Sequence, residues 1–443
     1  MRIDLTDNNI GQPDAGIFYR KDVAALFPFA DKSIAELCRE NENLLVFPYS
    51  IETTDDRIGE SSIINILNTG NAERVRIATG NIMGFIGIGN LQIKIKSRFD
   101  VGRDDFLLHY MLQKVMSFNI FDLHHNNEQE DVFDFVMFMF PYFLKAALRQ
   151  GVFREYQNYR HNDANIKGAI DIGRHIARNT PFVGNIAYST REYSHDNSMT
   201  ELIRHTIEFM KTKKYGQAVL NIDHETIENV NTIVGHTPLY SKGDRNNVIS
   251  KNLRSKIHPY YTEYRPLQVL CLQILRMEEV KYGESEDEIC GILFDGAWLW
   301  EEYVNTLLSK YGFTHPENKH HKGGIHLFED RSGIRYPDFY KDDIVLDAKY
   351  KRLGSYDKVS KVAPDDIHQV IAYMSALQVS KGGFVAPLEK RRSSGIPTSR
   401  LKGSESTLSI YGIEISKVAT SYADFCEKMK EMEEDFLDSL AIL

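Results

Sequence analysis

The order of apolar and polar positions predicts strands over the first part of the chain. Short apolar runs, several with alternating polar positions, predict strands at residues 44–47, 74–78, 84–88 and 91–96. Gly89-Asn90 separates the last two runs and is typical of a tight hairpin turn. Between Lys21 and Arg39 the apolar residues have helical spacing, interrupted near Pro28. We therefore predict a β-rich N-terminal domain over residues 1–103.

The spacing changes to a helical period after residue 103. Apolar positions recur at helical intervals from Phe106 to Met116, and a second, aromatic-rich run ends at Leu148. The pattern further predicts helices at residues 199–211 and from residue 267, a short strand at 165–173 and a polar connection at 244–255. An acidic run at residues 284–288 marks a boundary. We predict a mainly helical central region over residues 104–289.

The last part of the chain mixes helical and strand patterns. The predicted order is a helix at 297–311, strands at 325–327, 335–340 and 344–349, a helix at 364–378 and a strand at 383–386. This order predicts an α/β domain over residues 290–420, followed by an acidic amphipathic helix over residues 421–443. The predicted fold class is therefore a multidomain α+β and α/β protein.

Composition places the chain among ordinary soluble proteins. Its 443 residues, 42% hydrophobic and 26% charged, leave room for several domains. The start lacks the apolar core of a signal peptide, and the most apolar run, residues 133–144, is shorter than the roughly 18 residues that cross a bilayer. The four cysteines lack C-x-x-C spacing, which argues against a zinc site or a disulfide framework. We expect a cytoplasmic protein with no membrane partner.

Charge is distributed unevenly along the chain, whose net charge is −9. Residues 310–403 contain 17 Lys and Arg against 11 Asp and Glu, so this segment is basic and the rest strongly acidic. A basic segment favours contact with a phosphate backbone, although an excess of this size is also typical of a solvated surface. The same two interpretations apply to the basic side chains that would contact DNA, which are Lys351, Arg352, Lys390, Arg391, Arg392, Arg400 and Lys402.

The motif with the most chemical content is Pro337-Asp338 followed by Asp347-Ala348-Lys349. Side chains alternate between the faces of a strand, so Asp347 and Lys349 share one face. A two-residue turn at Asp342-Asp343 would pair Lys341 with Ile344. Asp338 would then lie opposite Asp347, with Cβ atoms roughly 5 Å apart.

Two carboxylates this close repel each other unless a cation lies between them. Oxygen ligands suit Mg²⁺ or Mn²⁺, and the neighbouring ammonium of Lys349 can face a phosphate or a metal-bound water. Taken alone, the pattern is loose, and an ordinary hairpin with surface charges would satisfy it most of the time.

Two predicted helices carry further candidate residues. Glu301 and Glu302 lie on the helix before the motif, where either one could complete a metal site or both could be ordinary surface residues. On the helix after the motif, Gln369 and Tyr373 are four residues apart and share one face.

The joint order of helix, strands, helix and strand with Glu, Asp, Asp-x-Lys and Gln-x-x-x-Tyr resembles the PD-(D/E)xK nuclease fold. This resemblance implies that Asp338 and Asp347 hold a divalent ion, to which Glu301 adds a ligand. Lys349 would position water or stabilise charge on phosphorus. Gln369 and Tyr373 would support the site or touch the DNA strand. The interval between Asp338 and Asp347 is short for this fold and demands the tight hairpin.

A second resemblance extends over most of the chain. Residues 84–99, residues 166–171 and the segment from Leu293 to Val304 resemble the McrC family. McrC is the nuclease subunit of the McrBC system, which restricts DNA carrying modified cytosine, and it works with McrB, a hexameric AAA+ GTPase. The resemblance implies that the N-terminal region engages and stimulates this motor, while the C-terminal domain cuts double-stranded DNA with Mg²⁺.

The glycines at positions 84, 87 and 89 do not form a phosphate-binding loop. Neither G-x-x-x-x-G-K-[ST] nor G-x-G-x-x-G occurs in the chain, so we expect it to bind no nucleotide itself and to need an external motor. Two alternatives stay open. One is a non-catalytic adaptor of an AAA+ ring with a vestigial nuclease fold, and the other is a standalone nuclease acting on RNA or single strands.

Overall fold

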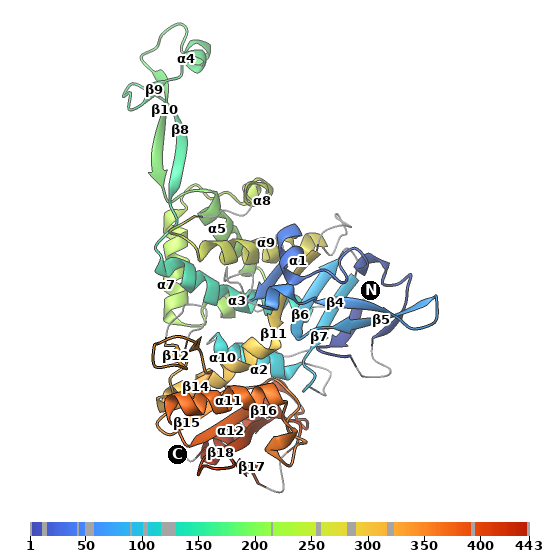
Figure 1. Cartoon of the computed structure of the whole chain (residues 1–443). Coiled ribbons are helices and arrows are strands. Elements are labelled where there is room, and N and C mark those ends of the chain that lie inside the picture. The colour runs from blue at the N-terminus through green and yellow to red at the C-terminus, as the bar shows by residue number, and fades with distance from the viewer. Residues whose placement is uncertain are drawn as a thin grey trace. The chain divides into compact units, whose positions relative to one another are not determined.

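The structure is a computed structural model (Figure 1). It describes residues 2–10, 16–41, 44–48, 57–88, 91–100, 105–116, 130–213, 216–253, 258–280, 289–316, 323–390 and 395–440. The chain forms two compact units, one made of Met1–Asn126 with Val280–Leu443 and the other of Asn127–Glu279. The first unit therefore joins the N-terminal and C-terminal parts of the chain.

A five-stranded sheet organises the N-terminal part, with the strand order β1-β7-β6-β11-β3. Its strands are β1 (Arg2–Thr6), β3 (Leu44–Phe47), β6 (Ile82–Ile88), β7 (Leu91–Lys96) and β11 (Ile289–Asp295). β6 and β7 pair antiparallel with Gly84 opposite Ile95, which confirms the predicted pairing. The predicted turn at Gly89-Asn90 lies outside the described residues.

A smaller sheet and a short helix complete this part. The sheet is formed by β2 (Ile17–Tyr19), β4 (Ile64–Asn68) and β5 (Arg74–Thr79). The predicted helical segment is divided into a 3₁₀ turn, Ala24–Leu26, and helix α1 (Ile34–Glu40). α1 begins after Ser33, whose side chain accepts a hydrogen bond from the Glu36 amide and forms a capping box. Apolar residues from both sheets and α1 share one buried core.

Strand β11 connects the ends of the chain, because it follows the second unit and yet lies in the N-terminal sheet. It pairs parallel with β3 and antiparallel with β6. Gly291 fits between them without a side chain, since a Cβ there would lie 2.4 Å from the carbonyl oxygen of Phe85. β11 leads directly into helix α10 (Gly296–Leu308), so the N-terminal sheet fixes the start of that helix.

The C-terminal part is a second five-stranded sheet, with the strand order β14-β15-β16-β18-β17. Its strands are β14 (Phe339–Lys341), β15 (Ile344–Ala348), β16 (Lys381–Leu388), β17 (Thr398–Arg400) and β18 (Thr407–Glu414). β15, β16 and β18 are parallel, and helix α11 (Pro364–Leu377) makes the crossover from β15 to β16. Where one strand was predicted over residues 335–340, β13 (Ile334–Arg335) pairs with β12 (Ile325–His326) and β14 begins separately.

Three helices of the first unit meet at a buried carboxylate. α2 (Phe106–Val115), α10 and the C-terminal helix α12 (Tyr422–Ser439) surround Glu433. Tyr110 and Tyr303 donate hydrogen bonds to Glu433 over 2.7 and 2.8 Å, and Lys114 forms an ion pair with it at 2.8 Å. The predicted amphipathic helix therefore holds α10 in place through its buried face.

The second unit combines helices with a long hairpin. Its longer helices are α3 (Glu130–Arg149), α5 (Ser198–Met210), α7 (His224–His236) and α9 (Tyr264–Val280). Two shorter helices are α6 (Gly216–Leu220) and α8 (Arg245–Asn252). The predicted polar connection at 244–255 is wrong, because α8 occupies most of that segment. The helix buries only Val248, Ile249 and Asn252, so its apolar spacing is too weak to predict a helix.

The hairpin pairs β8 (Glu155–Asp163) with β10 (Ile186–Ser194). It extends from the helices of its own unit, with β9 (Ala169–Ile170) and α4 (Ile172–Arg178) near its far end (Figure 1). Among the described helices, none has both the length and the apolar character needed to cross a membrane.

Candidate functional site

The hairpin of β14 and β15 has the predicted register. Lys341 pairs with Ile344, and Asp342 has φ +47°, a value suited to a tight turn. The same register continued by one residue places Asp338 across from Asp347. Asp338 Oδ2 accepts a hydrogen bond from the Ala348 amide over 2.6 Å, which fixes this carboxylate against the end of β15.

The two carboxylates lie in a poorly solvated position. Asp347 is 1% exposed and Asp338 is half-buried. Burial raises the pKa of Asp338 to about 8, with a further contribution from the nearby Glu301. Burial and then the charge of Asp338 raise the pKa of Asp347 to about 7. The two groups therefore titrate as an interacting pair whose charged form needs a compensating cation.

The ammonium of Lys349 occupies the centre of a group of oxygens. Its Nζ lies 2.7 Å from Asp347 Oδ2 and 3.6 Å from Asp366 Oδ1, and it donates to Gln369 Oε1 over 3.3 Å. Burial alone would lower the pKa of Lys349, but Asp347 and the other carboxylates raise it overall. Lys349 is therefore a cation at neutral pH and suits electrostatic stabilisation better than proton abstraction.

Helix α11 presents one polar face to this lysine. It begins at Pro364, a residue suited to the first helical position, and carries Asp366 in its first turn. Gln369 Nε2 donates to the Tyr373 hydroxyl over 2.8 Å, so the amide oxygen of Gln369 is turned toward Lys349. Tyr373 is 3% exposed and packs in the core of the C-terminal part. This burial favours a supporting role for Tyr373 rather than contact with a substrate strand.

Helix α10 brings acidic residues to the same region. Asp295 caps the helix by accepting 2.8 Å hydrogen bonds from the amides of Ala297 and Trp298. Glu301 and Glu302 each place an Oε1 atom 3.9 Å from His315 Nε2. Of the two, Glu301 is the one whose charge acts on Asp338.

His315 is a cation that the sequence interpretation overlooked. Its Nδ1 lies 2.7 Å from the Asp338 carbonyl oxygen, and its ring stacks on Phe339. Burial lowers the pKa of His315, but the carboxylates of Glu302 and Glu301, together with the contact to the Asp338 carbonyl oxygen, raise it to about 9. The β-bridge between Thr314 and Tyr340 brings it here, a contact that local spacing does not reveal.

Asp366 is the second residue that was missed. It is buried, and it binds Lys351 Nζ at 2.6 Å as well as Lys349. Its position three residues before Gln369 places it on the same helix face, and that spacing could have identified it.

Several of the predicted DNA-contacting side chains that the structure describes are already paired with acidic residues. Lys351 is engaged by Asp366, whereas Arg352 forms an ion pair with Glu389 at 3.0 Å and donates to the Arg98 carbonyl. Lys390 is exposed. Arg391 and Arg392 lie outside the described residues, and Arg400 forms an ion pair with Glu405.

Two adjacent carboxylates, Asp338 and Asp347, fit a Mg²⁺ ion in charge and in ligand type, because like charges this close are stabilised by a cation between them. Among the described residues no group of three or more His, Cys, Asp and Glu could hold a metal ion. Mg²⁺ commonly keeps several waters and takes only one or two carboxylates, so a pair of this kind suits it.

Comparison with known proteins gives a family match and a similar fold. A family model described as McrBC 5-methylcytosine restriction system component matches residues 77–387. A solved half-complex from a tetradecameric assembly of Thermococcus gammatolerans McrB AAA+ hexamers with bound McrC contains a chain with 14% identity and a TM-score of 0.50. That similarity covers 98% of this chain and 100% of the other.

A chain of the Thermococcus gammatolerans McrBC complex, solved by cryo-EM, is 14% identical with a TM-score of 0.32, covering 70% of this chain and 88% of that one. No curated protein matches the chain. The similarity to the half-complex chain, at this level of identity, is a similarity of fold.

Proposed function

This chain belongs to the family of McrBC 5-methylcytosine restriction system components, and we propose that it is the subunit that cuts DNA. Its C-terminal part would act as a PD-(D/E)xK nuclease domain that hydrolyses phosphodiester bonds with Mg²⁺. The observation that carries this proposal is the pair of carboxylates, Asp338 and Asp347, held across a tight hairpin beside the ammonium of Lys349.

Each residue of the site has a role that follows from its contacts. Asp338 and Asp347 would hold the ion, and the carboxylate of Glu301 on α10 would add negative charge beside Asp338. Bound there, Mg²⁺ would neutralise charge on the scissile phosphate and lower the pKa of a bound water. Lys349 would stabilise negative charge that develops on phosphorus, because it stays protonated and lies on the same strand face as Asp347.

The supporting residues keep Lys349 in place. Gln369 accepts its hydrogen bond and is itself oriented by Tyr373. Asp366 draws the same ammonium toward α11 and also binds Lys351. A lysine held from two sides loses little rotamer freedom when a substrate binds, which favours catalysis by preorganisation.

A motor partner is the second half of the proposal. The similar Thermococcus gammatolerans chain occurs in an assembly of McrB AAA+ hexamers with bound McrC. The present sequence contains no Walker A motif, so a chain of this family that acts on long DNA needs a motor from outside. We infer that it works with an AAA+ GTPase hexamer on double-stranded DNA carrying modified cytosine. The N-terminal region remains the predicted contact surface.

The alternative is an adaptor that activates the ring but does not cut. The contacts of the candidate site favour the nuclease, because Asp338, Asp347, Lys349 and Gln369 all have the side chains and the mutual contacts that the chemistry needs. In a vestigial site such buried charges would carry a desolvation cost without a function.

The decisive assay compares Asp338→Ala and Lys349→Ala proteins with the wild type, each mixed with its AAA+ partner, GTP, Mg²⁺ and cytosine-methylated DNA. Both variants should lose cleavage by about 10³-fold, because several kcal/mol of charge stabilisation disappear from the transition state. Both should still stimulate GTP hydrolysis. Asp342→Asn is the matched control, since Asp342 lies in the same hairpin with its side chain 82% exposed and asparagine also tolerates its φ of +47°. Undiminished cutting by both variants would remove this site from consideration.

Unmethylated DNA and single-stranded substrates complete the assay. Cleavage restricted to methylated duplex supports a modification-dependent restriction enzyme. Equal cleavage of RNA or single strands without the partner would favour the standalone nuclease instead.

A further inference from the structure

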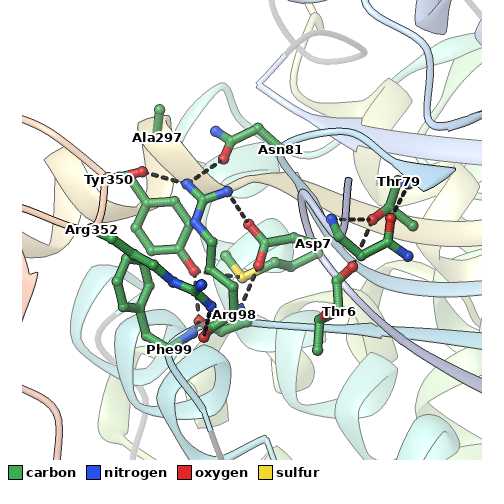
Figure 2. A network of polar contacts seen from close by, with 12 residues as sticks. Thr6, Asp7, Thr79, Asn81, Arg98, Phe99, Ala297, Tyr350 and Arg352 are labelled. Carbon is green, nitrogen blue, oxygen red and sulfur yellow. Dashed lines mark hydrogen bonds and ion pairs between the residues drawn. The ribbon is translucent and has the colours of Figure 1, made fainter. Parts of the chain in front are cut away.

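The residue that follows the Asp-x-Lys motif leaves the C-terminal sheet and packs against the N-terminal sheet. Tyr350 is 3% exposed, and it lies against Ser97, Arg98 and Phe99, directly after β7. Figure 2 shows the guanidinium of Arg98 between Asp7, Asn81 and Tyr350. The strand that carries Asp347 and Lys349 is thus anchored at its end by residues about 250 positions earlier in the sequence.

All three residues of this segment contact Tyr350. The Ser97 hydroxyl lies 2.6 Å from the Tyr350 hydroxyl, and the rings of Phe99 and Tyr350 meet edge to face at 5.0 Å. Arg98 lies over the Tyr350 ring with its guanidinium carbon 4.6 Å from the centroid, and its Nη2 donates to the Tyr350 carbonyl oxygen. Arg98 therefore holds both the side chain and the backbone of Tyr350.

Arg98 is itself fixed by the N-terminal sheet. Its backbone amide donates to Asp7 Oδ1, and its Nη1 lies 3.0 Å from Asp7 Oδ2. Its Nη2 also donates to Asn81 Oδ1 over 3.0 Å. Both the Arg98 side chain and Asp7 are almost fully buried. A guanidinium held by a carboxylate and an amide keeps one geometry, because its planar fork has few alternative arrangements.

Asn81, which binds Arg98, also contacts helix α10. The Asn81 carbonyl oxygen accepts a hydrogen bond from the amide of Gly296, the first residue of α10, over 2.8 Å. A Cβ at Gly296 would lie 2.7 Å from the Tyr350 ring, so only glycine lets the helix start this close to the tyrosine. The helix that carries Glu301 and the strand that carries Asp347 therefore share one point of attachment.

We propose that Arg98 is a positioning residue for the nuclease site, which fixes the end of β15 relative to α10 through Tyr350. The proposal rests on the proposed function for its effect on cleavage, but the anchoring itself is independent of that function. Arg98 acts only through other residues. It binds the carbonyl oxygen of Tyr350, the residue directly after Lys349. A reacting group displaced by about 1 Å loses roughly 10²-fold in rate.

Arg98→Lys is the sharpest variant. Lysine keeps a positive charge beside Asp7, so the fold should persist, but a single ammonium cannot bind Asp7, Asn81 and the Tyr350 carbonyl in the same geometry. Arg98→Gln removes the charge as well and serves as the second variant. Arg2→Lys is the matched control, because Arg2 lies in β1 of the same sheet and pairs with the exposed Asp4.

Hydrogen exchange of the full-length chain measures directly how firmly the end of β15 is held. The Ala348 amide donates to Asp338 and the Lys349 amide donates to the Val385 carbonyl, so both report on the end of β15. In Arg98→Lys these two amides should exchange about tenfold faster, while exchange in β16 and β18 stays as in the wild type. Cleavage of methylated DNA with the AAA+ partner should fall by about 10- to 100-fold, with GTPase stimulation retained.

The outcomes separate this proposal from the proposed function. Unchanged exchange of Ala348 and Lys349 in both Arg98 variants would overturn the anchoring whether or not the chain is a nuclease. Faster exchange with undiminished cleavage would overturn the link to catalysis, provided that Asp338→Ala abolishes cutting. Cleavage that survives Asp338→Ala would instead contradict the nuclease site, and the exchange data would still decide whether Arg98 positions the strand. Full rescue by lysine in both measurements would show that charge alone matters and would contradict the positioning role.

Discussion

Two buried carboxylates in the first unit differ in their nearest partners. Asp7 forms an ion pair with Arg98 at 3.0 Å, and the side chains of both residues are almost fully buried. Asp347 has a like charge beside it in Asp338, and its cation, Lys349, is also drawn to Asp366. Among the described residues, Asp7 therefore has a buried partner of its own, whereas Asp347 shares its partner and is repelled by a second carboxylate.

The two carboxylates are therefore suited to different roles. A buried ion pair with well-placed hydrogen bonds fixes a geometry, as Arg98 fixes Tyr350. Two adjacent buried carboxylates are unfavourable together and become favourable when a divalent cation binds between them. We interpret the Asp7–Arg98 pair as the anchor of the candidate site and the Asp338–Asp347 pair as the site itself.

Breaking the buried Asp7–Arg98 pair should have the largest effect on stability. Arg98→Met leaves Asp7 buried without its partner, and breaking a buried pair in this way costs about 3–5 kcal/mol. Chemical denaturation of the first unit at pH 7 and above measures this loss, and the loss should shrink below pH 6. Burial raises the pKa of Asp7 to about 6, so at lower pH the carboxyl is neutral and needs no partner. A loss under about 1 kcal/mol would show that Asp7 and Arg98 behave like a surface pair.

Removing the charge of Asp347 should leave the free energy of unfolding unchanged or increase it. Asp347→Asn relieves the repulsion with Asp338, and Lys349 keeps Asp366 as a partner. The metal-free variant should therefore lie within about 1 kcal/mol of the wild type or above it. The same denaturation experiment in EDTA measures this difference. A loss as large as that of Arg98→Met would contradict the repulsion between Asp338 and Asp347.

The pH dependence of stability should also distinguish the metal-free site from the site with Mg²⁺ bound. Burial and mutual repulsion raise the pKa of Asp338 to about 8 and of Asp347 to about 7, so the folded protein binds protons more tightly than the unfolded chain. Their contribution to stability is complete below pH 4 and is lost as pH rises through 7 and 8. Melting temperatures of the metal-free protein should fall over this range relative to the Asp338→Asn, Asp347→Asn double variant. Mg²⁺ should cancel that fall, because it binds the deprotonated pair. An identical pH profile for wild type and double variant would contradict the raised pKa values.

The smallest effect is expected at the edge of the site. Tyr373→Phe removes only the hydroxyl that orients Gln369, while the ring stays in the core. One lost hydrogen bond corresponds to about 2- to 10-fold in single-turnover cleavage. A loss above about 10²-fold would indicate that the tyrosine hydroxyl contacts the substrate itself.

The sequence predicted the local parts of this arrangement. The hairpin register followed from a two-residue turn and the alternation of side chains, and Lys341 does pair with Ile344. The shared face of Gln369 and Tyr373 followed from helical spacing, and the two side chains are hydrogen-bonded. Such features depend on a few neighbouring residues, so they can be predicted from a single sequence.

The parts that were missed depend on contacts between distant segments. β11 pairs with β6 although the sequence of the whole second unit lies between the two strands. Tyr350 likewise contacts Ser97 and Arg98, which lie about 250 positions earlier in the sequence. His315 reaches Asp338 through a single β-bridge. The Ser97-Arg98-Phe99 segment lies in the region that resembles the McrC family, but only the fold shows what these residues bind. Nothing in local spacing or charge indicates such pairings.

Direct measurement of metal binding tests whether Asp338 and Asp347 form a divalent-cation site. Electron paramagnetic resonance with Mn²⁺ on the full-length chain, at pH 8 with methylated DNA present, counts bound ions and their displacement by Mg²⁺. The wild type should bind Mn²⁺ at a site from which Mg²⁺ displaces it, Asp347→Asn should lose that site, and the exposed Asp342→Asn should retain it. Equal Mn²⁺ binding by Asp347→Asn and the wild type would contradict a divalent-cation site at this pair.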